Sequence, residues 1–163
     1  RQRIGVRMAD PRFMRRAIEL SREVMDRGGG GPFGAVIVKD GRIIAEGSNR
    51  VTSSYNPTAH AEIVAIRIAC AALGSFNLQG CEVYTSCEPC PMCLSAIYWA
   101  RIDRIYYGNN RQDAARIGFD DDFLYREIAL PLEARSVPLV RLLPEEARAA
   151  FDAWDANPDK IRY

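Results

Sequence analysis

Three cysteines lie at steps of three residues in the segment YTSCEPCPMC, at Cys87, Cys90 and Cys93. The only histidine of the chain, His60, lies upstream in PTAHAEIVAI, with Glu62 two residues further on. Thiolate and imidazole are ligands that zinc prefers, and a carboxylate beside them can move protons. These residue types allow three kinds of chemistry: metal binding, a C-x-x-C redox pair, or simple burial of inert thiols.

The position of the cysteines in the predicted secondary structure separates them. Pro89 and Pro91 both favour a helix start, because the backbone N–H groups of a first helical turn have no partner within the helix. Cys90 and Cys93 then share one side of the first turn, where the helix N-terminus stabilises thiolate. Cys87 precedes the prolines, where the chain is still leaving a strand, and is predicted to be a bystander.

An H-x-E motif followed, after a strand, by P-C-x-x-C is the pattern of the zinc deaminases. One histidine and two cysteines leave the fourth position of a tetrahedral zinc ion open for water, as in a catalytic site. We therefore predict Zn²⁺ as the cofactor, with His60, Cys90 and Cys93 as its ligands. Glu62 is predicted to be the catalytic general acid and base, which takes a proton from water and passes it on. The predicted reaction is hydrolytic deamination of a nucleobase-like ring.

Other interpretations of the same residues stay open. Cys87 could be a fourth ligand that closes a structural zinc site, and the protein would then be a binding module without turnover. Cys87 and Cys90 could instead form a thiol oxidoreductase site. Glu62 could be a carboxylate that merely favours a helix N-terminus. Cys70 and Cys81 are most simply small buried hydrophobic residues.

The elements that must position these residues follow from the hydrophobic pattern. A helix is predicted over 10–27, with Asp10 as its N-cap, and a β-hairpin over 34–47, turned by Asp40 and Gly41. Further predicted elements are a buried helix over 59–73, a strand in CEVYTS, a helix over 91–100, a strand in RIYYG, a late strand in SVPLVRLL and a helix over 144–156. Strands separated by helices imply parallel pairing. The predicted fold is therefore a three-layer α/β/α domain with a mixed sheet, covering residues 1–163.

The composition is that of a globular domain, with 48% hydrophobic residues, 26% charged residues and a net charge of +1. This balance argues against binding to long nucleic acid. Six arginines crowd the N-terminal part of the chain: Arg1, Arg3, Arg7, Arg12, Arg15 and Arg16. We interpret them as a solvated tail and an exposed helix face and not as a binding site for a polyanion. Five cysteines, without a signal peptide or an apolar run of membrane-spanning length, predict a cytoplasmic protein.

The segments GGPFGAVIVKDG, NPTAHAE, YTSCEPCPMC and IYWAR resemble the cytidine and deoxycytidylate deaminase superfamily, and most of all its small bacterial guanine deaminases. The resemblance runs from about Phe13 to Tyr163. It implies that the substrate is a purine base and that the reaction converts guanine to xanthine and ammonia. The alternatives are deaminases of guanosine, of adenine in transfer RNA, of cytosine, or of an aminated triazine or pterin.

The resemblance also implies a substrate pocket. Asn49 in EGSN would hold the base edge, and Phe33 and Trp99 would line or stack on the ring. Asp121 of GFDD and the terminal Tyr163 would complete the pocket. Taken without the resemblance, Phe33 and Trp99 also suit a core, and Asn49 also suits a turn.

In that branch the C-terminal segment is exchanged within a homodimer. Residues 110–163 are therefore expected to pass between subunits, with Asp121 and Tyr163 reaching the partner's active site. This sequence has a third adjacent acid, so the assignment lies among Asp120, Asp121 and Asp122. In isolation, such a triplet also suits a solvated loop or a helix cap.

Overall fold

A four-stranded sheet forms the centre of the protein, in a computed structural model that describes residues 8–163. The strand order is β2-β1-β3-β4. Strand β1 (Gly34–Lys39) pairs antiparallel with both β2 (Arg42–Ser48) and β3 (Cys81–Cys87), and β3 pairs parallel with β4 (Arg104–Asn109). The predicted mixed sheet is confirmed.

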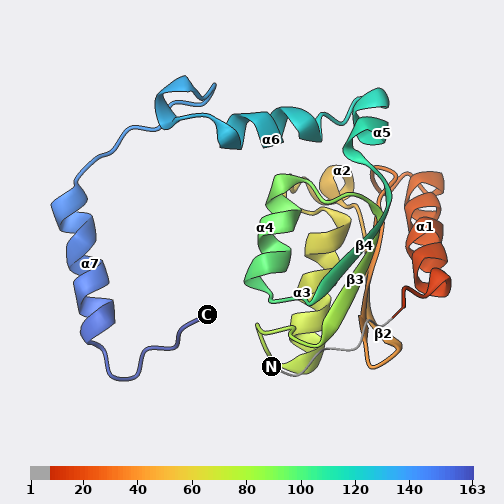
Figure 1. Cartoon of the computed structure of the whole chain (residues 1–163), viewed down its shortest axis with the longest axis horizontal. Coiled ribbons are helices and arrows are strands. Elements are labelled where there is room, and N and C mark those ends of the chain that lie inside the picture. The colour runs from red at the N-terminus through yellow and green to blue at the C-terminus, as the bar shows by residue number, and fades with distance from the viewer. Residues whose placement is uncertain (1–7) are drawn as a thin grey trace.

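Helices cover both faces of this sheet. In chain order the described helices are α1 (Pro11–Asp26), α2 (Val51–Ser54), α3 (Ala61–Leu73), α4 (Pro91–Trp99), α5 (Arg111–Arg116), α6 (Asp121–Ala129), the 3-10 helix η1 (Leu132–Ala134) and α7 (Pro144–Ala156). Helix α1 lies on one face, and α3 and α4 lie on the other (Figure 1). The three-layer α/β/α architecture is therefore confirmed.

The N-terminal half folds as its turn and cap residues predict. The side chain of Asp10 accepts a hydrogen bond of 3.0 Å from the backbone N–H of Arg12 and so caps α1, with Pro11 as the first helical residue. Between β1 and β2, Asp40 and Gly41 take φ angles of +50° and +76°. Two consecutive residues in the left-handed region form the tight hairpin turn whose twist matches the strands.

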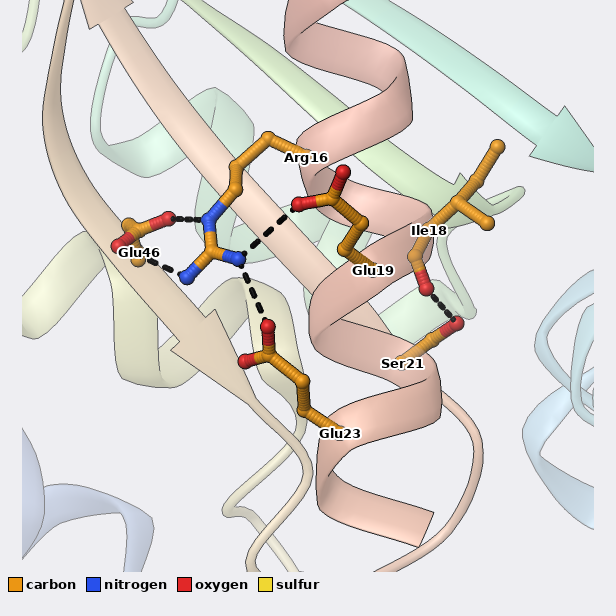
Figure 2. Close-up of polar contacts among 6 residues, drawn as sticks. All are labelled: Arg16, Ile18, Glu19, Ser21, Glu23 and Glu46. Carbon is orange, nitrogen blue, oxygen red and sulfur yellow. Dashed lines mark hydrogen bonds and ion pairs between the residues drawn. The ribbon is translucent and has the colours of Figure 1, made fainter. Parts of the chain in front are cut away.

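Arg16 links α1 to the edge of the sheet through three carboxylates. Its guanidinium pairs with Glu46 of β2 and, at 3.2 Å and 2.9 Å, with Glu19 and Glu23 of its own helix (Figure 2). One helical turn further on, the hydroxyl of Ser21 donates to the carbonyl of Ile18 at 2.6 Å. The ion pairs of Arg16 with these three carboxylates fix α1 against β2, on the face of the sheet opposite α3.

The arginine-rich start is only partly described. Arg12 pairs with Asp10 at 2.8 Å, and Arg16 belongs to the network above, so both have local acidic partners. Arg1, Arg3 and Arg7 lie outside the described residues.

Small residues bring α3 close to the sheet. Ala61, Ala65 and Ala69 are fully buried against β1 and β2. A Cβ atom at Gly47 would lie 2.2 Å from the carbonyl oxygen of Ala61, so only glycine permits this approach. The first turn of α3 is thereby fixed over the end of β2. The helix begins at Ala61, two residues after the predicted start at residue 59.

The region after β4 differs from its prediction. The predicted strand SVPLVRLL is wrong for the single chain, because residues 136–143 form no helix or strand. A strand needs a neighbour for its N–H and C=O groups, and none of the strands described within residues 8–163 pairs with that segment. The helix predicted over 144–156 is confirmed as α7. Residues 130–163, after α6, extend away from the core, and the chain end returns toward α3 and α4 (Figure 1).

Among residues 8–163, no helix has the length and apolar character that a bilayer crossing requires.

Candidate functional site

The predicted metal ligands meet where two helices begin. His60 is the N-cap residue of α3, and Cys90 is the N-cap residue of α4. Cys93 lies in the first turn of α4 and is fully buried. The Nδ1 atom of His60 lies 3.6 Å from the Sγ atom of each cysteine. Within the described chain, these three residues form the group whose ligand atoms could share one metal ion, with all atoms within 4.8 Å of one another.

These separations fit a tetrahedral zinc ion. Bond lengths of about 2.3 Å to sulfur and about 2.0 Å to nitrogen, at tetrahedral angles, place S and N about 3.5 Å apart. The observed distance is 3.6 Å for both cysteines. Cys87, at the end of β3, lies outside the cluster. The cluster therefore offers three groups that could bind one metal ion, the number expected of an open site.

The thiols of the cluster are strongly polarised by one another. The hydrogen bond from Cys93, reinforced by His60, lowers the pKa of Cys90 to about 4. The pKa of Cys93 is raised in turn, first because its proton is held against Cys90 and then because of burial. Burial raises the pKa of Cys87 to about 12. These shifts favour the thiolate of Cys90, the form that binds metal, and the neutral thiol of Cys87.

Glu62 lies beside this cluster and is buried, with 6% of its surface exposed. The hydroxyl of Thr85 donates to Oε1 of Glu62 at 3.1 Å and lies 3.0 Å from the carbonyl oxygen of Cys87. Burial raises the pKa of Glu62, because a charged carboxylate loses its hydration there. A carboxyl group with these properties can carry a proton between two reacting atoms more readily than a solvated one.

A pocket of about 280 Å³ opens over the cluster and Glu62. Six of the residues singled out from the sequence line it: Phe33, Asn49, His60, Glu62, Cys90 and Asp121. They come from the loop before β1, the end of β2, the starts of α3 and α4, and the start of α6. Segments far apart in the sequence therefore converge on one cavity.

Asn49 is both a turn residue and a pocket residue. Its side-chain oxygen accepts hydrogen bonds from the backbone N–H groups of Gly31 at 3.3 Å and Val51 at 3.1 Å. Because both bonds use the oxygen, the amide NH₂ group is the donor that remains for a ligand in the described structure. A Cβ atom at Gly30 would lie 2.1 Å from the carbonyl oxygen of Asn49, so glycine is required for this loop to pack there.

The acidic triplet separates into three roles. Asp120 caps α6 by accepting a 3.0 Å hydrogen bond from the backbone N–H of Phe123, and Asp122 pairs with Arg126. Asp121 alone of the three lines the pocket. Burial raises its pKa, with Cys90 contributing in the same direction. In this structure Asp121 lines the pocket of its own chain. The resemblance implied instead that Asp121 would reach the active site of the partner subunit.

Trp99 and Tyr163 lie away from this pocket. Trp99 ends α4, nine residues after Cys90, and is therefore about 13 Å further along the helix axis. The rings of Trp99 and Tyr163 are 5.9 Å apart, and that of Phe76 lies 6.3 Å from Tyr163. Trp99 is 65% exposed and Tyr163 71% exposed. In the single chain these two aromatic residues therefore contact each other, and neither lines the pocket at the His-Cys-Cys cluster.

The structure also adds pocket residues that the sequence pattern did not single out as ligand contacts. They are Gly31, Val51, Thr52, Pro57, Cys87, Glu88 and Phe119. Phe119 packs edge-on against Phe33 with ring centroids 4.9 Å apart. Its signal was available, since it belongs to the same GFDD motif as Asp121. Glu88 likewise lies inside the CEPC segment, between the bystander cysteine and the first ligand.

A His-Cys-Cys cluster beside a buried glutamate, at the starts of two helices of an α/β/α domain, defines the class of metal-dependent nucleobase deaminases. Residues 8–109 match the family described as the cytidine and deoxycytidylate deaminase zinc-binding region. The protein belongs to this family.

Similarity to guanine deaminases extends well beyond the matched region. The guanine deaminase of Bacillus subtilis is 54% identical over 151 residues, which cover 93% of this chain and 97% of that protein. Its crystal structure superposes with a TM-score of 0.92 at 52% identity, covering 96% of this chain and 99% of that one. A guanine deaminase structure from Nitrosomonas europaea gives a TM-score of 0.67 at 31% identity, over 96% and 90% of the two chains.

A transfer-RNA-specific adenosine deaminase from Agrobacterium fabrum is also 54% identical, but only over 77 residues. That stretch covers 47% of this chain and 51% of the relative. Similarity to this transfer-RNA deaminase thus covers about half of the chain, whereas similarity to the Bacillus subtilis guanine deaminase covers nearly all of it. This chain is a guanine deaminase homologue over nearly its whole length, as its sequence motifs predicted.

Proposed function

We propose that the protein hydrolyses guanine to xanthine and ammonia, using a zinc ion held by His60, Cys90 and Cys93. The observation that supports this proposal is the pocket, which Glu62 and Asp121 line together with His60 and Cys90 of the His-Cys-Cys cluster. The near full-length similarity to a guanine deaminase supports the choice of base. When bound, zinc supplies Lewis acidity that lowers the pKa of a water molecule to about 7.

Glu62 carries the protons of the reaction. The water oxygen forms a bond to the ring carbon that bears the amino group, and the bond from that carbon to the amino nitrogen breaks. Glu62 takes a proton from the water and delivers it to the ring nitrogen. It then takes the second proton, from the hydroxyl now on that carbon, and delivers it to the departing amine as the carbonyl group forms. Its burial keeps bulk water from competing for these protons, and the hydroxyl of Thr85 fixes one of its oxygens.

Asp121, Asn49 and Phe33 recognise the base. Guanine presents N–H donors along its edge, and an ionised carboxylate is a pure acceptor, so Asp121 suits that edge. The NH₂ group of Asn49 complements an acceptor of the base, and Phe33 supplies an aromatic wall. No Arg or Lys is among the described residues that line the pocket, so nothing there is suited to a nucleotide phosphate.

Ammonia release from a panel of aminated rings tests this function. Guanine is expected to react at least tenfold faster than guanosine, adenine, cytosine and cytidine. A pocket of about 280 Å³, just below the roughly 300–1,000 Å³ typical of ligand sites, suits a free base better than a nucleoside, and the acceptor Asp121 suits the N–H edge of guanine. The measurement is the initial rate with each compound at equal concentration and with the zinc content determined. A faster rate with guanosine would contradict the choice of a free base.

We infer that the part of the C-terminal region that follows α6, residues 130–163, is exchanged in a homodimer. Large apolar side chains on the segment are exposed in the single chain, among them Val140 at 85%, Phe151 at 79% and Leu142 at 78%. Such a surface is unfavourable in water and is typical of an interface. Residues 136–143, which carry Val140 and Leu142, would pair with a strand of the second copy. That segment would then become the strand that its sequence predicts.

In this dimer, Tyr163 of one subunit completes the pocket of the other. Mixing two inactive variants tests the exchange directly. Glu62→Gln and Tyr163→Ala homodimers are each expected to be nearly inactive. A mixed dimer has one pocket with both residues intact, so refolding an equal mixture should restore roughly a quarter of the wild-type rate. If Tyr163 instead serves the pocket of its own chain, no pocket is repaired and the mixture stays inactive.

A further inference from the structure

Helix α6 is held against the metal-binding loop by three residues outside the predicted site. Arg111, the first residue of α5, pairs with Glu88 through Nη2 at 2.9 Å and Nε at 3.0 Å, and its backbone N–H donates to Oε1 of Glu88 at 3.0 Å. Glu88 is only 18% exposed and lies two residues before Cys90. A paired contact of this kind is geometrically specific, so it fixes the start of α5 beside the loop.

Tyr125 of α6 completes the arrangement. Its hydroxyl donates to the carbonyl oxygen of Pro89 at 2.6 Å, immediately before Cys90. The guanidinium carbon of Arg111 lies 3.8 Å from the centre of the Tyr125 ring. The ring of Tyr125 thus packs against Arg111, which is itself paired with Glu88, and its hydroxyl is bonded to the backbone of the metal-binding loop. Stacking and hydrogen bonding together leave its ring a single position.

The position of Tyr125 determines where Asp121 lies. The two residues are four apart in α6, so they share one face of the helix. Beyond the contact of α6 with the start of α4, the described anchors of this region to the core are the Tyr125 hydrogen bond, the Arg111 pair and the packing of Phe119 on Phe33. A shift of α6 by a fraction of a turn would therefore carry the carboxylate of Asp121 out of the pocket.

We propose that Tyr125, supported by Arg111, is a positioning residue that holds Asp121 at the base edge of the substrate. This inference rests on the proposed role of Asp121 in guanine recognition. Tyr125 touches neither the substrate nor the reacting atoms. It acts through the helix that carries Asp121, and so it determines substrate affinity and leaves proton transfer by Glu62 unaffected.

A double-mutant cycle tests the inference. Tyr125→Phe removes one hydrogen bond but keeps the stacked ring, so KM for guanine should rise about fivefold with kcat within twofold and zinc content unchanged. Asp121→Asn alone should raise KM further. Adding Tyr125→Phe to Asp121→Asn should change KM by less than twofold, because the residue being positioned has already lost its charge. Tyr55→Phe, at a side chain that is 95% exposed, is the matched control and should leave KM unchanged.

Hydrogen exchange gives a readout that is independent of turnover. In Tyr125→Phe the α6 amides should exchange about fivefold faster, with and without zinc, while those of α3 should not change. Three outcomes would each overturn the proposal. KM could be unchanged in Tyr125→Phe, the Tyr125→Phe protein could lose its zinc, or the two substitutions could multiply their effects on KM in the double variant. A wild-type protein inactive on guanine would refute the proposed function instead. The exchange rates of α6 would then still decide whether Tyr125 docks that helix.

Discussion

The Glu62→Gln protein is expected to bind zinc normally and to deaminate guanine about 10²–10⁴-fold more slowly than the wild type, the usual contribution of a general acid and base. Glutamine has nearly the same shape as glutamate, and its side-chain oxygen can keep the hydrogen bond from Thr85. The metal ligands are untouched. What the substitution removes is the capacity to take up and release a proton, so the loss should fall on kcat with little change in KM.

A surface carboxylate provides the control for this experiment. Glu19 of α1 lies on the opposite face of the sheet, where its side chain is 61% exposed beside Arg16. Glu19→Gln makes the same chemical change away from the pocket and should retain full activity. Metal analysis and the thermal unfolding midpoint should accompany both rate measurements. Near wild-type turnover by Glu62→Gln would refute the mechanism, because no other described carboxyl group in the pocket is as deeply buried beside the cluster.

The central part of the fold could be predicted because each element there has its own local signal. Asp10 and Pro11 mark the start of α1, and Asp40 with Gly41 marks the hairpin turn. The Pro-Cys pattern marks the start of α4. The metal cluster was predictable for the same reason, since its three residues lie at helix starts that the sequence itself identifies. Their convergence needed only two helices on the same face of one sheet.

The C-terminal region was harder to predict because its signals are not local. Val137, Leu139, Val140 and Leu142 supply the apolar residues of a strand, yet the described sheet contains no strand that pairs with them. The capping box of Asn110 and Asp113 at the start of α5 was available as a short-range signal and was missed. A sequence pattern records the tendency to form a strand, but the partner that satisfies its backbone groups can belong to another molecule.

The substrate pocket falls between these two cases. Phe33, Asn49 and Asp121 meet in one cavity, although Asp121 lies 61 residues after His60. No periodicity links such distant positions, and resemblance to a family brought them together before the structure did. Trp99 and Tyr163 have the same origin, but the single chain leaves them at the far end of α4. Their predicted place in the pocket therefore requires the proposed dimer.

Cys90→Ala is expected to lose both zinc and activity, whereas Cys87→Ala keeps its zinc. Removing one of three protein ligands should weaken zinc binding by more than the 10–100-fold that follows loss of an outer-shell partner. Cys87 lies outside the cluster, and burial keeps it a neutral thiol with a pKa of about 12, so its removal takes away no ligand. The measurement is zinc per chain after dialysis, compared among the wild type and both variants.

Chelation distinguishes loss of a ligand from a general loss of stability. A ligand that binds only the folded state stabilises it, so a chelator should lower the unfolding midpoint of the wild type and of Cys87→Ala. The midpoint of Cys90→Ala should not respond, because that protein has little zinc to lose. If Cys87→Ala also lost its zinc, the site would be closed by four protein ligands. Without an open coordination position for water, Glu62 would have no activated water to deprotonate, and the deaminase mechanism would fail with it.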